Sequence, residues 1–94
     1  MSNSKPKQWY VYILRCADDS LYTGISNDLE RRVKQHNSTT GQGARYTRAR
    51  QPVSLVYQEP ASDRATASQR EYAIKQLTRR DKLQLIQQAK NALL

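Results

Sequence analysis

Three short segments of the chain carry the side-chain patterns that are typical of β-strands. Residues 9–15 and 21–25 are rich in Tyr, Val, Ile and Thr, and turn-forming residues at 18–20 separate them, which predicts a β-hairpin. Residues 53–58 alternate between apolar and polar side chains and predict a third strand. We expect Pro60 to end this strand, because proline lacks the N–H that strand pairing needs.

Apolar side chains recur with the helical period in three other segments. Asn27 can cap a helix, with Glu30 three positions later to complete a capping box, and this helix is predicted to run to about residue 37. A second helix is predicted over about 62–77. Thr78 provides the capping signal for a last helix near the end of the chain.

The length of the hairpin loop decides which sheet face its tyrosines occupy. A three-residue loop at 18–20 places Ala17 opposite Leu21. Tyr22 then lies on the same face as Tyr12, whereas a two-residue loop puts the two tyrosines on opposite faces. A site that both tyrosines share requires the first register.

Length and composition narrow the class of protein. The 94 residues predict a flexible leader at 1–8 and a single domain at 9–94. Cys16 has no intrachain partner and no neighbours that would activate a thiol, so we expect a structural role for it. No signal segment is present, and no apolar run approaches the roughly 18 to 20 residues of a membrane span. A cytoplasmic protein with no membrane partner is predicted.

Positive charge is concentrated in one part of the chain. The net charge is +8, and residues 31–58 contain six basic side chains and no acidic one. A local field of this kind attracts polyanions, above all nucleic acid. A basic surface with no partner is the alternative.

Residues 38–52 are predicted to form a long loop within this basic stretch. Its arginines alternate with an aromatic side chain, which suits contact with a nucleic-acid backbone and stacking on bases without sequence readout. A disordered loop is the rival interpretation. The candidate nucleic-acid-binding residues are Lys34, Arg45, Tyr46, Arg48 and Arg50.

Two polar side chains flank the apolar stripe of the first predicted helix. On a helical wheel Arg32 and His36 border this stripe, next to Leu29, whereas Arg31 points away from it. Arg32 and His36 are one turn apart, so their polar ends can meet. An arginine beside a core needs an anionic or polar group to receive it, and a phosphate would serve. Alternatively, the arginine reaches past the core to solvent and the histidine bonds to a backbone carbonyl.

An acidic residue lies within the inward-facing arc of the second predicted helix. Glu71 is close on the wheel to Ala67 and Ile74, which are expected to face the core. Lys75, one turn further on, offers a purely structural explanation, an ordinary ion pair between residues i and i+4. The presence of an inward arginine, an inward histidine and two strand tyrosines favours a shared polar site instead.

The order and spacing of these motifs are those of a known family. The relevant segments are Tyr10-Val11-Tyr12, Leu21-Tyr22-Thr23-Gly24, the run from Asp28 to His36, and the single helical Glu71. Over about residues 9–86 the chain resembles the GIY-YIG nuclease superfamily. It is most similar to the small, stand-alone bacterial branch, which is related to the nuclease module of the excision-repair endonuclease.

The resemblance implies a fold and an activity. The fold is α+β, with a small three-stranded antiparallel β-sheet packed by about three α-helices. The activity is divalent-metal-dependent endonucleolytic hydrolysis of phosphodiester bonds, in DNA rather than RNA, with structured, damaged or single-stranded substrates and a role in repair or recombination. One Mg²⁺ or Mn²⁺ ion, and no other cofactor, is implied.

The resemblance also assigns roles to residues. Glu71 corresponds to the metal-ligating carboxylate and Arg32 to the arginine on the attacked phosphate. Tyr12 and Tyr22 correspond to the two motif tyrosines, and His36 to a position that holds His or Tyr in relatives. Because free tyrosine has a pKa of about 10, it becomes a useful base only beside cationic groups. Our hypothesis is that one tyrosine accepts the water proton with His36 assisting, while the other orients water or phosphate.

Two positions depart from the family pattern. Tyr10 replaces the glycine of the first motif, and Ile25 stands where the excision-repair branch tends to carry a lysine. Loss of that lysine removes a cation that could lower a tyrosine pKa. A second hypothesis therefore stays open, a catalytically weak or inactive nucleic-acid-binding module of the same fold.

Overall fold

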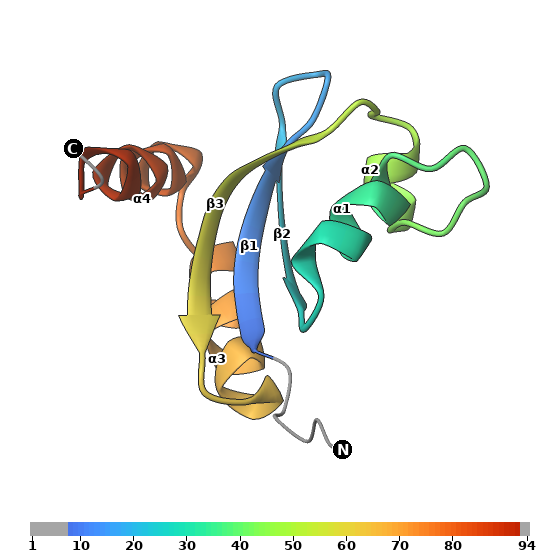
Figure 1. The fold of residues 1–94 in the computed structure, drawn as a ribbon. Coiled ribbons are helices and arrows are strands. Elements are labelled where there is room, and N and C mark those ends of the chain that lie inside the picture. Colours follow the sequence, from blue (N-terminus) through green and yellow to red (C-terminus); the bar gives the residue numbers. More distant parts are fainter. Residues whose placement is uncertain (1–7, 93–94) are drawn as a thin grey trace, which may run out of the picture.

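The structure, a computed structural model, describes residues 8–92, with one β-sheet and helices against both of its faces (Figure 1). The elements in chain order are β1 (Trp9–Arg15), β2 (Leu21–Ser26), α1 (Leu29–His36), α2 (Arg45–Arg48), β3 (Ser54–Ala61), α3 (Arg64–Lys75) and α4 (Arg79–Ala92). The α+β class with a three-stranded antiparallel sheet is confirmed. Apart from Gln8, the predicted leader lies outside the described residues. None of the helices described is long and apolar enough to cross a membrane.

Strand β1 is the centre of the sheet, with β2 on one side and β3 on the other. Because alternate strand residues point to opposite faces, β1 contributes to two separate cores. Val11 and Ile13 face the first core, where they pack with Ala67, Ile74 and Ile86. These partners come from α3 and α4, so these two helices cover this face. Figure 1 shows α3 behind the strands.

The second core lies on the opposite face of the sheet. Tyr12 and Leu14 of β1 are buried there together with Val53. Leu29 and Val33 of α1 pack against this cluster as its partly buried boundary. The apolar stripe predicted for the first helix is therefore the surface that seats α1 on the sheet.

Two helix starts test the capping predictions. Asp28, not Asn27, is the N-cap of α1, and its carboxylate accepts a hydrogen bond from the Arg31 N–H at 3.3 Å. Asn and Asp are nearly equal as N-caps, so two adjacent candidates could not be separated by residue type. The predicted cap before α4 is confirmed, because Thr78 Oγ1 accepts from the Asp81 N–H at 3.1 Å.

The third strand is longer than predicted and continues through Pro60 to Ala61. Pro60 lies opposite Tyr10 of β1, and β3 has no strand on its other side within residues 8–92. An edge strand tolerates proline because one of its sides needs no partner. The expectation that Pro60 ends the strand is therefore wrong.

The hairpin register differs from the predicted one by two positions. The last ladder pair is Arg15 with Leu21, and the Cys16 N–H donates to the Ser20 carbonyl at 2.9 Å. Ala17 therefore has no partner opposite Leu21. A shift of two positions leaves every side chain on its predicted face. Tyr12 and Tyr22 accordingly do lie on the same face, as a shared site requires.

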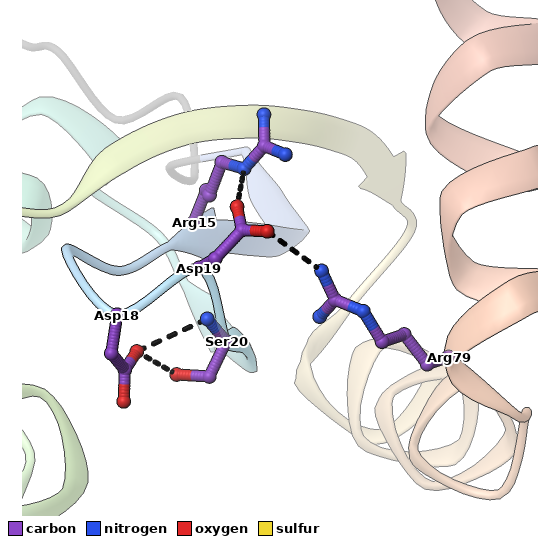
Figure 2. A network of polar contacts seen from close by, with 5 residues as sticks. All are labelled: Arg15, Asp18, Asp19, Ser20 and Arg79. Carbon is purple, nitrogen blue, oxygen red and sulfur yellow. Dashed lines mark hydrogen bonds and ion pairs between the residues drawn. The ribbon is translucent and has the colours of Figure 1, made fainter.

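Charged side chains tie the tip of the hairpin to the rest of the molecule (Figure 2). Asp19 is left-handed at φ 70°, a conformation that aspartate tolerates. Its carboxylate meets Arg15 Nε at 2.6 Å and Arg79 Nη2, at the start of α4, at 3.3 Å. Asp18 accepts hydrogen bonds from the Ser20 hydroxyl at 2.5 Å and from the Ser20 N–H at 3.0 Å, and these two bonds hold the pKa of its carboxyl below the usual value.

Gly24 lies opposite Tyr12 in the β1–β2 ladder, where there is no room for a side chain. A Cβ atom at this position would lie 2.6 Å from Tyr12 Oη and 2.7 Å from Tyr12 Cζ. The Tyr12 side chain is buried and cannot move aside freely. The glycine therefore makes space for the tyrosine ring.

Replacement of Gly24 by alanine should destabilise the fold by about 1 to 3 kcal/mol, because the added methyl group overpacks a buried ring. Urea unfolding measures this cost. In a Tyr12→Leu background, which removes the ring, the same substitution should cost much less. Equal costs in the two backgrounds would show that the ring is not the reason for the glycine.

Candidate active site

A buried hydrogen bond joins the central strand to α1. Tyr12 Oη and His36 Nε2 are 2.8 Å apart, and the two residues are 1% and 0% exposed. Tyr12 comes from the central strand and His36 from the last turn of α1. His36 Nδ1 faces Thr47 Oγ1 at 2.7 Å, so the alternative in which His36 bonds to a backbone carbonyl is wrong.

Two further aromatic rings join this pair. The Tyr22 ring centroid lies 6.4 Å from that of Tyr12 and 5.2 Å from that of His36. Tyr46 of α2 stacks on Tyr22, with ring centroids 6.0 Å apart and an interplanar angle of 27°. We call Tyr12, Tyr22, His36 and Tyr46 the ring cluster. Its two outer members, Tyr22 and Tyr46, are partly exposed.

Arg32 reaches this cluster from α1, one turn before His36. Its Nη1 donates to Gln35 Oε1 at 3.0 Å and to the Gln42 carbonyl at 3.2 Å. Arg32 also works to lower the pKa of the Tyr12 hydroxyl, against the larger effect of burial. All of these acceptors are neutral, and Arg32 makes no ion pair with a carboxylate of residues 8–92. Its positive charge is therefore held in place without being neutralised there.

Burial shifts the protonation of the inner members of the ring cluster. Desolvation raises the pKa of Tyr12 to about 12, although hydrogen bonding from Arg32 opposes the rise. Desolvation, with the charge of Arg32 as the second cause, lowers the pKa of His36 to about 4. Both groups are therefore neutral at pH 7. The cationic surroundings that our hypothesis required do not lower the pKa of Tyr12.

Glu71 approaches the cluster from a different direction. It lies on α3, the helix that packs on the far face of the sheet, and its side chain is 23% exposed. Its charge raises the pKa of Tyr12, as the smallest of the contributing causes. It also pairs with Lys75 Nζ at 3.3 Å, so the ion pair considered from the sequence is present. The charge of Glu71 thus opposes the effect of Arg32 on the pKa of Tyr12, and its effect is the smaller of the two.

The donor set near the ring cluster decides what kind of metal site could exist. In the part of the chain that the structure describes, no three His, Cys, Asp or Glu side chains gather in a way that could hold a metal ion. A cage built entirely from protein ligands is therefore excluded for those residues. Mg²⁺ keeps several waters and binds through one or two carboxylates, so the half-buried Glu71 alone fits this chemistry.

The predicted nucleic-acid-binding residues fall into two groups. Lys34 pairs with Glu30 at 3.6 Å on the solvent side of α1, and Arg45 and Arg48 are exposed on α2. Neither of these two arginines forms an ion pair with any residue from 8 to 92. Their charges are thus free to meet an outside partner.

Arg50, in contrast, is committed to internal contacts. Its Nε lies 3.0 Å from an Asp18 carboxylate oxygen, and its Nη1 donates to the Tyr46 carbonyl at 2.8 Å. The guanidinium also lies 3.9 Å from the centre of the Tyr46 ring. Arg50 therefore joins the hairpin tip to the ring cluster, a link that the sequence pattern did not reveal.

A polar hollow adjoins Arg32 at the start of α1. Its volume is about 220 Å³, and it is lined by Ser26, Asn27, Asp28, Arg31, Arg32 and Gln35. A larger hollow of about 480 Å³, apolar and lined in part by Leu29, Val33 and Leu55, lies between α1 and β3, away from the ring cluster. The polar hollow is the one that borders the candidate active site.

Sequence reasoning missed one buried member of the site, Thr47. It is 0% exposed and lies in α2, within the segment predicted to be an irregular loop. A four-residue helix carries too little periodicity to be recognised, so no sequence signal pointed to this residue.

Comparisons with known proteins agree with this architecture. The family profile described as the GIY-YIG catalytic domain matches residues 8–84. A UPF0213 protein of Desulfotalea psychrophila is 60% identical over 70 residues, which are 74% of this chain and 63% of that protein. This chain thus spans less than two thirds of that relative. A UPF0213 protein of Clostridium perfringens is 60% identical over 77 residues, 82% of this chain and 81% of that protein.

Two solved structures are also similar. The solution NMR structure of a UPF0213 protein from Bacillus halodurans has 45% sequence identity and a TM-score of 0.54, and the match covers 85% of this chain and 83% of that one. A solution NMR structure of a protein from E. faecalis has 38% identity and a TM-score of 0.59, covering 96% and 92%. The profile match and these relatives show that the chain belongs to the GIY-YIG nuclease superfamily.

Proposed function

We propose that this protein is an endonuclease that hydrolyses phosphodiester bonds in DNA with the help of one Mg²⁺ or Mn²⁺ ion. The observation that carries the proposal is the environment of Arg32. Its guanidinium is held by Gln35 and Gln42, both neutral, beside the ring cluster and a polar hollow. A fixed guanidinium without a carboxylate partner suits bidentate contact with a phosphate.

The residues divide the work of the reaction. Phosphodiester hydrolysis needs an aligned water, a group that removes its proton, and positive charge to offset the charge that grows on the phosphate. Arg32 supplies fixed charge to the phosphate oxygens. A divalent cation near Glu71 would supply further positive charge at the same centre.

We assign contact with the attacking water to Tyr22 rather than Tyr12. Tyr12 is 1% exposed and its hydroxyl is bonded to His36, so solvent does not reach it. Tyr22 is only partly buried, and no group among residues 8–92 forms a hydrogen bond with its hydroxyl. In this proposal Tyr12 and His36 do not contact the water and instead support the position of Arg32.

The basic surface supports a substrate recognised by its backbone. Arg45 and Arg48 are exposed on α2, next to Tyr46 of the ring cluster. Backbone contacts of this kind position a strand without reading its sequence, so we propose substrates defined by structure, such as branched, damaged or single-stranded DNA. Such substrates arise in DNA repair and in recombination.

Glu71→Gln should abolish cleavage in Mg²⁺ or Mn²⁺ while leaving DNA binding nearly unchanged, because the substitution keeps the shape but removes the charge that attracts the metal. The measurement is cleavage of duplex, single-stranded, flapped and RNA substrates, with and without Mn²⁺. Glu30→Gln is the matched control, since Glu30 also pairs with a lysine one turn on. Equal cleavage by the Glu71 variant would refute the metal role. Binding without cleavage by the unaltered protein would favour the inactive binding module.

Arg32→Ala should reduce kcat by about 10²- to 10³-fold, the usual loss when one donor to the transition state is removed. Single-turnover cleavage at saturating protein measures this loss without a contribution from binding. Arg31→Ala is the control on the same helix, because Arg31 lines the same hollow but is exposed and lies outside the ring cluster. Similar losses for the two variants would contradict a specific role for Arg32.

Replacing both Arg45 and Arg48 with glutamine should weaken binding to all sequences alike. It should also reduce the slope of log Kd against log salt by up to about 2, as expected when two phosphate contacts are lost. Fluorescence anisotropy across a salt series measures the slope. Arg50→Gln should change it much less, because Asp18 already neutralises Arg50. An unchanged slope in the double variant would exclude α2 as a DNA contact.

A further inference from the structure

Thr47 is a buried hydroxyl residue that the proposed chemistry does not use. It is 0% exposed, and Thr47 Oγ1 lies 2.7 Å from His36 Nδ1 and 3.0 Å from the Ala44 carbonyl oxygen. Buried polar groups are costly unless they are hydrogen-bonded, and both contacts have good hydrogen-bond lengths. Thr47 therefore belongs to a closed polar network beneath α1.

The Ala44 carbonyl, at one end of this network, determines where the hydrogens of the network lie. A carbonyl oxygen can only accept, so the single Thr47 hydroxyl hydrogen is donated to Ala44. Thr47 Oγ1 then accepts from His36 at 2.7 Å, which places the imidazole hydrogen on Nδ1, because this contact is much shorter than the 3.5 Å between the Ala44 nitrogen and the same ring nitrogen. The pKa of His36, lowered to about 4, keeps the ring neutral at pH 7, with one hydrogen to place.

The other ring nitrogen then determines what Tyr12 can do. With the imidazole hydrogen on Nδ1, Nε2 is an acceptor and takes the hydrogen of the Tyr12 hydroxyl at 2.8 Å. The lone pairs of the Tyr12 oxygen then stay open to the positive charge of Arg32, which works to lower the pKa of Tyr12. The opposite tautomer would make His36 donate to the Tyr12 oxygen, and the Tyr12 hydrogen would then have no acceptor among residues 8–92.

The loop before Thr47 packs closely against the end of α1 and holds this arrangement in place. A Cβ atom on Gly43 would lie 2.6 Å from His36 Cα and 2.8 Å from the Gln35 carbonyl oxygen. The absence of a side chain at position 43 lets the loop lie directly against the end of α1. The loop thereby brings Ala44 and the following α2 to the buried edge of His36.

We infer that Thr47 is a positioning residue that fixes the Nδ1–H tautomer of His36 and so makes the Tyr12 hydroxyl donate to His36, with its lone pairs left open to the positive charge of Arg32. Its effect on catalysis rests on the proposed role of Arg32 at the phosphate. Its effect on the tautomer does not, so the two can be tested separately. Hydrogen bonds that fix a histidine tautomer in this way are a general means of orienting groups at a site.

The tautomer can be measured directly, because His36 is the only histidine in the chain. Long-range ¹H–¹⁵N correlation NMR of the full-length protein should show a protonated Nδ1 and an unprotonated Nε2 at pH 7. A hydrogen on Nε2 in the unaltered protein would overturn the inference whatever the protein's activity. Thr47→Ser should keep the original tautomer, because it keeps the hydroxyl.

Thr47→Val removes the hydroxyl with little change of shape and should shift the hydrogen wholly or partly to Nε2. Ala44, whose N–H lies 3.5 Å from Nδ1, can then act as the donor there. Thermal unfolding checks that the variant is folded, and Thr47→Ala replaces it if it is not. An unchanged tautomer in the variant would overturn the inference.

The same variants test the consequence for Arg32 through the kcat and KM of DNA cleavage. Thr47→Val should lower kcat by about 10- to 100-fold with little change in KM, and Thr47→Ser should restore it. A shifted tautomer with unchanged kcat would overturn the positioning role. If the unaltered protein cleaves no substrate, the proposed function fails, and the NMR result alone then decides whether Thr47 fixes the tautomer.

Discussion

The hydrogen bond between Tyr12 and His36 is the interaction on which the rest of the site depends. It joins the central strand to α1 where both side chains are almost completely buried. Removing either partner would leave a polar group without a bond in an apolar interior, which costs far more than a surface hydrogen bond contributes. Three features of the fold accommodate this bond: the glycine opposite Tyr12, the α1 stripe that seats the helix, and the loop that closes over His36.

This bond also explains why positive charge can be kept next to the core. Arg32 lies against neutral acceptors, and the neutral state of His36 prevents repulsion between two adjacent cations. Burial that holds the histidine uncharged therefore makes the arginine tolerable. A phosphate that entered this region would meet one guanidinium whose charge no carboxylate of residues 8–92 cancels, which is the electrostatic basis of the phosphodiester recognition that we propose.

Much of the fold could be predicted from the sequence, and the limits have physical causes. The common face of Tyr12 and Tyr22 was predicted, although the loop length was not, because face depends only on whether the register is odd or even. The cap of α1 and the end of β3 were predicted wrongly, because Asn and Asp cap equally well and proline is excluded only from inner strands. Thr47 could not be found, because its role comes from tertiary contacts across a segment without periodicity. The roles of Tyr22, Arg32 and Glu71 remain predictions.

The tip of the hairpin carries a different kind of attachment from the buried bond. Asp19 joins Arg15 to Arg79, and these side chains are 48% to 62% exposed (Figure 2). Water and dissolved ions weaken such contacts, whereas they do not reach the interior. The first turn of α4 is thus held to the hairpin by ion pairs that weaken as ionic strength rises, while Ile86 anchors the same helix in the core. The attachment at the start of α4 therefore depends on the salt concentration, whereas the packing of its middle does not.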